Sequence, residues 1–206
     1  MSFIEKVYKS EIDGDALKAL TDAIFAVAMT ILVLDIKRPE SLNALLQPGV
    51  YNAYLSGLMF DILLCALVFI ILGYIWIGLR HMLEDIHRTD KISLWIMLFL
   101  LLGVVLVPLF YSLISEAGQT FPVFTLLFHL NFILIGVCWA LEFYYCASKG
   151  FMGDVSNIIP KIRNILLVPL SALTGIIITL LGYPASSNYV YLIFPVLKQM
   201  YFYLKD

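Results

Sequence analysis

The first apolar run of the chain reads LKALTDAIFAVAMTILVLDI and covers residues 17–36. At a rise of ~1.5 Å per residue, about 20 helical residues reach across the ~30 Å hydrocarbon core of a bilayer. The run therefore predicts a membrane-spanning helix. It also carries polar side chains, with Thr21 and Asp22 near its start and Thr30 near its middle. Because polar side chains inside a membrane face protein or water, they are candidates for a functional site.

One face of this predicted helix collects four residues at helical spacing. Val27, Thr30, Ile31 and Leu34 follow each other at i, i+3, i+4 and i+7. The spacing alone is more typical of an ordinary contact between two helices, but we interpret this stripe as the wall of a pore. Asp22 lies about 140° around the helix from Val27, so we expect it to tie the helix to a neighbour.

Composition places the whole chain in the membrane. Of its 206 residues, 62% are hydrophobic and only 14% are charged, which is far more apolar than a soluble domain. The net charge of -2 offers no basic face for nucleic acid, so the expected surroundings are a lipid bilayer.

Six apolar runs predict six transmembrane helices in one all-α domain that spans residues 1–206. The runs cover residues 17–36, 55–79, 93–115, 121–146, 163–182 and 188–204. The last run is the weakest, because Pro195 and Lys198 interrupt it.

Lysine and arginine predict the orientation of these helices. If the N-terminus is cytoplasmic, eleven Lys and Arg residues fall on the inner side, and only Lys37 and Arg38 fall on the outer side. This asymmetry fits the positive-inside rule with both termini in the cytoplasm. We expect a multi-pass protein of the cell membrane.

Motifs of enzymes and cofactor proteins are missing from the sequence. It has no phosphate-binding loop, no His-Glu-x-x-His, no Gly-x-Ser-x-Gly and no dinucleotide fingerprint, so we expect no enzyme and no cofactor. The three cysteines lack the spacing of a metal site and are interpreted as packing residues. A Thr-Val-Gly-Tyr-Gly filter is also missing, which excludes a pore built from backbone carbonyls.

Isolated polar residues interrupt the later runs. We expect Asp61 to lie hydrated near the outer interface and Asn131 to bridge two helices by hydrogen bonding. His129 and Glu142 are thirteen residues apart, which puts them on different sides of a helix, so they do not form an acid–base pair within it. Structural or interfacial roles are expected for both.

The first half of the chain resembles a known family of membrane channels. Residues 20–39 are similar to the opening helix of the transmembrane protein 175 family, Trp76 stands where its second helix carries a Trp, and residues 94–108 resemble its third helix. The family consists of potassium-permeable channels, which in prokaryotes assemble as tetramers of six-helix subunits. The resemblance implies a homotetramer in a prokaryotic plasma membrane whose central pore is lined by the first helix.

Two family motifs are altered in this chain. The family signature is Arg-x-x-x-Phe-Ser-Asp, and its four specified positions are occupied here by Ala16, Leu20, Thr21 and Asp22. Only the Asp is kept; the Ser is replaced by the related Thr, and the Arg and the Phe are missing. Where the family carries His residues after the second-helix Trp, this chain has Leu79 and Arg80, with His81 one position later. The resemblance implies an interhelical network at the cytoplasmic end that contains Thr21, Asp22, Trp76, Arg80 and His81. Within it, we expect Arg80 to replace the cation lost at Ala16 and to pair with Asp22.

The family also implies an apolar constriction in the pore. By position this constriction falls on Val27, with Thr30 one turn further out and Ile31 and Leu34 beyond. A ring of such side chains gates by dewetting. Because Val is small, we expect the constriction at Val27 to be wide and the selectivity among ions to be weak. Potassium is the expected permeant ion, with other monovalent cations and protons left open. Arg38, if it faces the outer vestibule, would oppose cation entry.

Two other functions fit the sequence. A secondary transporter often carries a binding site on inverted repeats, but the second half of the chain has no counterpart of the Thr21-Asp22 element. A non-conducting structural membrane subunit is the second alternative, because the family signature is incomplete.

Overall fold

The computed structural model describes residues 14–36, 49–118, 120–153 and 158–192, together with the single positions 39, 43 and 46. These residues are helical apart from their connections and one isolated bridge between Ile86 and Met152. The elements are α2 (Gly14–Ile31), the 3-10 helix η1 (Leu32–Asp35), α3 (Val50–Asp85), α4 (Lys91–Ala117), α5 (Pro122–Ser148), α6 (Ile158–Leu180) and α7 (Pro184–Ser187). The expected all-α class is confirmed.

Five of the described helical segments are long and apolar enough to cross a membrane: Asp15–Asp35, Val50–Asp85, Lys91–Ala117, Pro122–Lys149 and Ile162–Leu180. They correspond to the first five apolar runs of the sequence. The sixth predicted run, 188–204, lies outside the described residues beyond position 192, and so do both ends of the chain. The cytoplasmic placement of the termini therefore stays a prediction.

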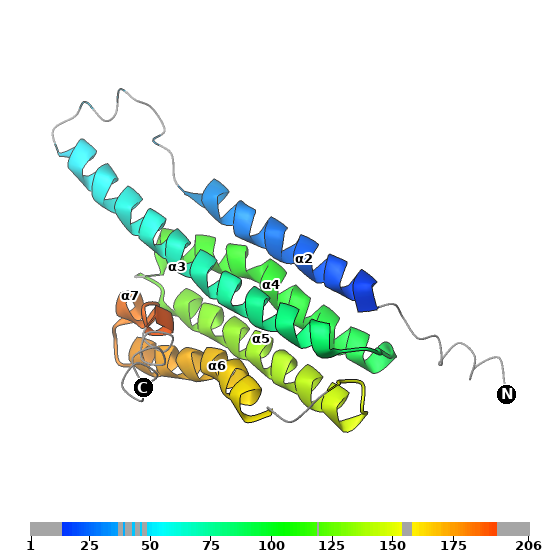
Figure 1. Cartoon of the computed structure of the whole chain (residues 1–206). Helices are drawn as coiled ribbons and strands as arrows, with labels where there is room; N and C mark the ends of the chain where they lie inside the picture. The colour runs from blue at the N-terminus through cyan, green and yellow to red at the C-terminus, as the bar shows by residue number, and fades with distance from the viewer. Residues whose placement is uncertain are drawn as a thin grey trace, which may run out of the picture.

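The helices form a bundle with α2 at one edge and α6 at the other (Figure 1). Helix α2 packs on α3 and α4, α4 packs along α5, and α5 packs along α6, which also contacts the short α7. We call the end of the bundle where α3 and α5 finish and α4 and α6 begin the inner end, because the positive-inside prediction places it toward the cytoplasm.

Local contacts fix the inner end. The Asp90 carboxylate caps α4 by accepting hydrogen bonds from the backbone N–H groups of Ile92 and Ser93, both at 3.0 Å. The loop after α3 is joined to the loop after α5, since the N–H of His87 donates to the carbonyl of Phe151 at 2.9 Å. The ends of α3 and α5 are therefore held together.

Polar residues inside the bundle are hydrogen-bonded across helices. Asn131 donates to the carbonyl of Gly103 at 2.9 Å, which confirms its predicted bridging role between α5 and α4. His129 and Glu142 are fully buried. His129 contacts Tyr191 and Ser187, whereas Glu142 accepts hydrogen bonds from Ser93 and Cys146.

The expectation for Asp61 was wrong. Its side chain is buried between α3 and α4 instead of hydrated, and it accepts a hydrogen bond from the Ser115 hydroxyl at 2.6 Å. Tyr111 donates to the backbone carbonyl of the same residue at 3.2 Å. Residues in the outer part of α4 therefore take the place of the water molecules that were expected to hydrate Asp61.

Helices α5 and α6 approach each other closely at Gly136. A Cβ atom at this position would lie 2.6 Å from Cδ of Pro169, whose rigid ring cannot move aside without shifting α6. We expect Gly136→Ala to lower the free energy of unfolding by about 1–3 kcal/mol, the usual cost of overpacking. Thermal denaturation of the purified protein in detergent, followed by helical circular dichroism, measures the change.

Gly57→Ala is the matched control, because Gly57 is also helical but a Cβ there meets nothing within 4 Å. This variant should be neutral or stabilising, since Ala is the better helix former. Equal behaviour of the two variants would contradict the close contact between α5 and α6.

Candidate functional site

Helix α2 has one buried side and one exposed side. Its buried stripe consists of Leu17, Thr21, Phe25, Ala28 and, in η1, Leu32. The opposite side carries the predicted pore residues: Val27 is 56% exposed, Leu34 is 70% exposed, and Thr30 and Ile31 are exposed as well. Among the described residues the stripe is thus not an internal helix–helix contact of this chain. It is free to face another subunit, lipid or a pore.

From Ala16 to Leu34 the exposed side of α2 and η1 is uncharged, whereas Asp15 in the first turn of α2 is an exposed acid. The surface of this side is formed by Ala16, Leu20, Ala23, Val27, Thr30, Ile31 and Leu34, which follow each other at helical spacing. The Thr30 hydroxyl donates a hydrogen bond to the carbonyl of Val27 at 2.9 Å. Its proton is therefore engaged within the helix, and the oxygen keeps acceptor capacity for a ligand outside it.

An anchor network of Asp22, Trp76, Arg80 and Glu84 ties α2 to α3. The Trp76 indole N–H donates to Oδ1 of Asp22 at 2.8 Å, and an Arg80 guanidinium N–H donates to Oδ2 at 2.8 Å. The predicted pair of Arg80 and Asp22 is therefore present. Arg80 also contacts Glu84 at 3.4 Å.

Helical spacing explains this geometry. Trp76, Arg80 and Glu84 follow each other at i, i+4 and i+8, so they share the face of α3 that meets α2. The side chains of Arg80 and Asp22 are 38% and 41% exposed, so the pair contributes only about 1 kcal/mol to stability. Its main effect is directional, because two hydrogen bonds to one carboxylate fix the rotation of α2 about its axis.

Two residues expected in the network lie elsewhere. The hydroxyl of Thr21 donates to the carbonyl of Leu17 in its own helix at 2.9 Å and belongs to the buried stripe. His81 is exposed and lines a cleft of about 310 Å³ between α3, α5 and α6. Adjacent helical residues point about 100° apart, so neither can share the direction of Asp22 or Arg80. Glu84 was missed, although its spacing from Arg80 is typical of an ion pair.

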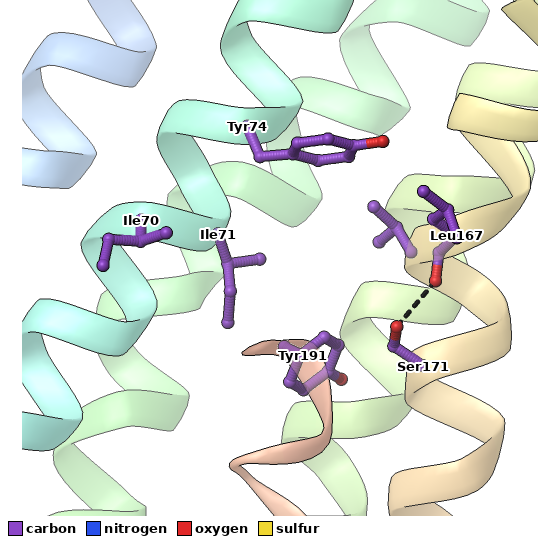
Figure 2. Close-up of a pocket in the computed structure, with 7 residues that line it drawn as sticks. Ile70, Ile71, Tyr74, Leu167, Ser171 and Tyr191 are labelled. Atoms are coloured by element: carbon purple, nitrogen blue, oxygen red, sulfur yellow. Dashed lines mark hydrogen bonds between the residues drawn. The ribbon is translucent and has the colours of Figure 1, made fainter. Parts of the chain in front are cut away.

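A second hollow lies between α3 and α6 (Figure 2). Ile70, Ile71 and Tyr74 of α3 face Leu167 and Ser171 of α6, with Tyr191 at one end. Its volume of about 30 Å³ leaves room for little more than one water molecule. The Ser171 hydroxyl already donates to the carbonyl of Leu167 at 2.7 Å. We therefore do not regard this hollow as a ligand site.

Metal-binding residues do not gather in the described part of the chain: no three His, Cys, Asp or Glu side chains there are arranged to hold an ion. Cys65, Cys138 and Cys146 are free thiols in the helical bundle. The candidate site therefore consists of the exposed side of α2 and the anchor network behind it.

Comparisons with known protein sequences match about half of the chain. Residues 16–108 match the model of the protein family described as "Endosomal/lysosomal potassium channel TMEM175". The chain is 25% identical over 104 residues to a potassium channel of Streptomyces collinus, and this match covers 50% of the chain and 48% of that protein. It is 30% identical over 96 residues to a potassium channel of a Chryseobacterium species, covering 45% and 44%. The chain thus matches about half the length of these curated relatives.

A solved structure resembles the chain over nearly its whole length. It is a crystal structure of a variant of the potassium channel MtTMEM175, bound to a nanobody fusion protein. The TM-score is 0.59 at 16% sequence identity, and the match covers 96% of this chain and 94% of that chain. At this identity the comparison establishes a shared fold.

The anchor network predicts coupled effects of substitution. We expect Asp22→Asn and Arg80→Gln each to lower the free energy of unfolding by about 1 kcal/mol, because each removes the charge attraction and weakens one hydrogen bond. The double variant should cost little more than either single one. A double-mutant cycle of thermal denaturation in detergent measures this coupling.

The exposed pair of Lys18 and Asp15, whose atoms lie 3.0 Å apart within one helix, provides the control. Asp15→Asn should change stability by no more than a few tenths of a kcal/mol. Additive effects of the Asp22 and Arg80 substitutions would refute the coupling.

Proposed function

Because the chain belongs to the family of the endosomal/lysosomal potassium channel TMEM175, we propose that it is a potassium-permeable channel. It is a multi-pass membrane protein, with five described helices long enough to cross a bilayer. Two curated relatives, both bacterial, are named potassium channels, which supports this function and a prokaryotic plasma membrane as the location. The channel requires no cofactor, because passive flow of an ion needs only a path through the membrane.

The observation that carries the proposal is the arrangement of α2. One side is packed on α3 and α4 and hydrogen-bonded to α3, while the other side, with Val27, Thr30 and Leu34, is exposed and uncharged. A closed ring of identical subunits brings the same surface of each copy toward the symmetry axis. In a homotetramer, four exposed α2 faces would surround a central pore, and α5 and α6 would lie at the periphery.

The proposed pore gates by its apolar lining. The four Val27 side chains form the constriction, with Ile31 and Leu34 continuing the apolar wall toward the outer end. An ion in such a ring loses hydration without gaining a dipole, so a narrow ring is dry and closed and a wider one conducts. The Thr30 oxygen, one turn from Val27, offers weak coordination to a passing cation. Lys37 and Arg38 lie outside the described residues, so the effect of Arg38 on cation entry stays a prediction.

Substitution at Val27 tests the pore directly. Val27→Ala should raise the rate of potassium flux by widening the constriction, and Val27→Trp should abolish it by filling the pore. The measurement is potassium efflux from liposomes that contain the purified, reconstituted protein. Val105→Trp is the matched control, because Val105 lies in α4 and is 53% exposed against 56% for Val27. This variant should conduct like the original protein.

The same assay separates the alternatives. Equal loss of flux in Val27→Trp and Val105→Trp would contradict a pore lined by α2. Flux that saturates with substrate concentration would identify a secondary transporter. No flux in any variant, with the oligomer intact, would leave a non-conducting membrane subunit.

Thr30 should influence which ion passes. Thr30→Val keeps the shape of the side chain but removes its oxygen, whereas Thr30→Ser keeps the hydroxyl. We expect Thr30→Val to lower the permeability ratio of potassium to sodium by about fivefold, since a weak polar contact is worth roughly 1 kcal/mol. Thr30→Ser should retain the ratio. Reversal potentials in planar bilayers with unequal potassium and sodium measure it, and identical ratios in both variants would exclude a role for the oxygen.

A further inference from the structure

A buried histidine in the outer half of α5 joins this helix to the segment that follows α6. His129 is fully buried, with Nε2 at 3.0 Å from the Ser187 hydroxyl of α7 and Nδ1 at 2.9 Å from the Tyr191 hydroxyl. The rings of His129 and Tyr191 are stacked, with their centroids 5.6 Å apart. We call these three residues the His129 cluster. They hold residues 184–192 against the bundle.

Helix α6 leaves the imidazole no room to move. A Cβ atom at Gly175 would lie 2.4 Å from Cε1 of His129, so the ring lies directly on the backbone of α6. One turn further along α6, the Thr179 hydroxyl lies 2.9 Å from that of Ser187. The ring therefore cannot turn toward water unless α6 or residues 184–192 are displaced.

The hydrogen bonds of the His129 cluster fit a neutral imidazole. The Ser187 hydroxyl donates to the carbonyl of Pro184 at 2.7 Å, so its oxygen accepts from the N–H at Nε2. Nδ1 then carries no proton and accepts from the Tyr191 hydroxyl. A proton on Nδ1 would turn this acceptor into a donor. The Tyr191 hydroxyl has no other hydrogen-bond partner in the described part of the chain, so its own proton would be buried without an acceptor.

The segments after α5 offer no carboxylate to a charged His129. Residues 164–192 contain no Asp, Glu, Lys or Arg, and the bases of α6, Lys161 and Arg163, lie near its inner end. The titratable groups of this stretch are three tyrosines, of which Tyr183 and Tyr189 are exposed and Tyr191 contacts the ring. These segments therefore surround His129 with uncharged groups.

Helices α4 and α5 also leave His129 without a counter-charge. The other charged residue of α5, Glu142, lies thirteen residues, or about 20 Å, further inward. The bond from Asn131 to Gly103 places His129 beside the stretch of α4 between Lys91 and Glu116, which carries no charge. Among the titratable groups at the outer end, Glu116 is exposed, the Asp61 carboxylate of α3 is bonded to Ser115, and the Tyr111 hydroxyl is bonded to the Asp61 carbonyl. An imidazolium at His129 would be buried without water or an opposite charge, which is strongly unfavourable.

A polar atom in the same segment favours its opening. Asn188 is 1% exposed, and its side-chain oxygen has no hydrogen-bond partner among the described residues. Water would satisfy this oxygen after opening, so its burial works against the closed arrangement.

We propose that His129 is a proton-sensitive latch for residues 184–192. The neutral imidazole holds Tyr191 and α7 against α5. Uptake of a proton releases this segment, and the imidazolium becomes hydrated. Tyr191 also lies between α3 and α6, against Ile70 and Ile71, so its release loosens that contact as well (Figure 2). The latch is a property of the single chain and does not depend on ion conduction.

Hydrogen exchange measured by mass spectrometry tests the latch in the intact protein in detergent. A solvated histidine has a pKa of about 6.5, whereas the closed latch requires a neutral ring, so each pH unit below this value favours opening about tenfold. The measured quantity is the protection of the backbone N–H groups of residues 185–192, corrected for the intrinsic exchange rate. We expect it to fall about tenfold between pH 7.5 and pH 5.5.

Three variants assign this pH dependence to the His129 cluster. His129→Gln keeps an amide that can bond the hydroxyls but does not titrate, so the protection should be equal at both pH values. Tyr191→Phe keeps the packing of the ring and removes its hydroxyl, so the protection should already be lower at pH 7.5 and still fall at pH 5.5. His81→Gln is the matched control, because His81 is exposed, and this variant should behave like the original protein.

Three results would overturn the proposal. Equal protection of residues 185–192 at the two pH values in the original protein would show that no proton opens the segment. An equal fall in His129→Gln would assign the pH dependence to another group. If His129→Gln does not fold, unchanged protection in Tyr191→Phe at pH 7.5 would show that the hydroxyl does not hold the segment.

Discussion

The orientation of α2 depends on the carboxylate of Asp22. Hydrophobic burial holds α2 against the bundle, but this force is non-directional and would tolerate some rotation of the helix. The two oxygens of Asp22 receive separate hydrogen bonds from Trp76 and Arg80, and these bonds require a defined rotation. That rotation is the one that buries Phe25 and exposes Val27. Packing and polar contacts therefore specify the same arrangement, and the exposed side of α2 follows from it.

Helix α3 connects this arrangement to the core. On the side facing α2 it carries Trp76, Arg80 and Glu84, and on another side it carries Gly78, against which the Trp139 ring of α5 is packed. A Cβ atom at Gly78 would lie 2.3 Å from Cη2 of Trp139, so only glycine permits the ring to come this close. The position of α5 thus helps to set the position of α3, and α3 in turn orients α2. The geometry of the site at the edge of the bundle therefore depends on the packing of α3 and α5 at its centre.

Sequence reasoning succeeded where one helix contains the whole pattern. The spacing of Val27, Thr30 and Ile31 placed them on one side, and the angle to Asp22 placed that residue on another, as the structure has it. It failed where a partner comes from another helix. The burial of Asp61 depends on Ser115, which is 54 residues away, and no local spacing indicates such a contact. Thr21 and His81 were assigned to the network by resemblance, but each lies one helical position from a true member and points elsewhere. The roles of Val27, Thr30, Ile31 and Leu34 in a pore stay predictions, because a single chain shows their exposure and not what they face.

The position of the cation in the anchor network affects the rest of α2. In the family that this chain resembles, an arginine occupies the position of Ala16. This position lies within about 20° of Val27 around the helix axis. A charge there would stand on the exposed side of α2. In this chain the cation is Arg80, on α3, and the side of α2 from Ala16 to Leu34 carries no charge. The proposed pore would therefore have an uncharged wall from the level of Ala16 to the level of Leu34. A wall without fixed charge cannot attract cations, so selection in such a pore depends on the width of the Val27 ring and on the Thr30 oxygen, both of which come from α2.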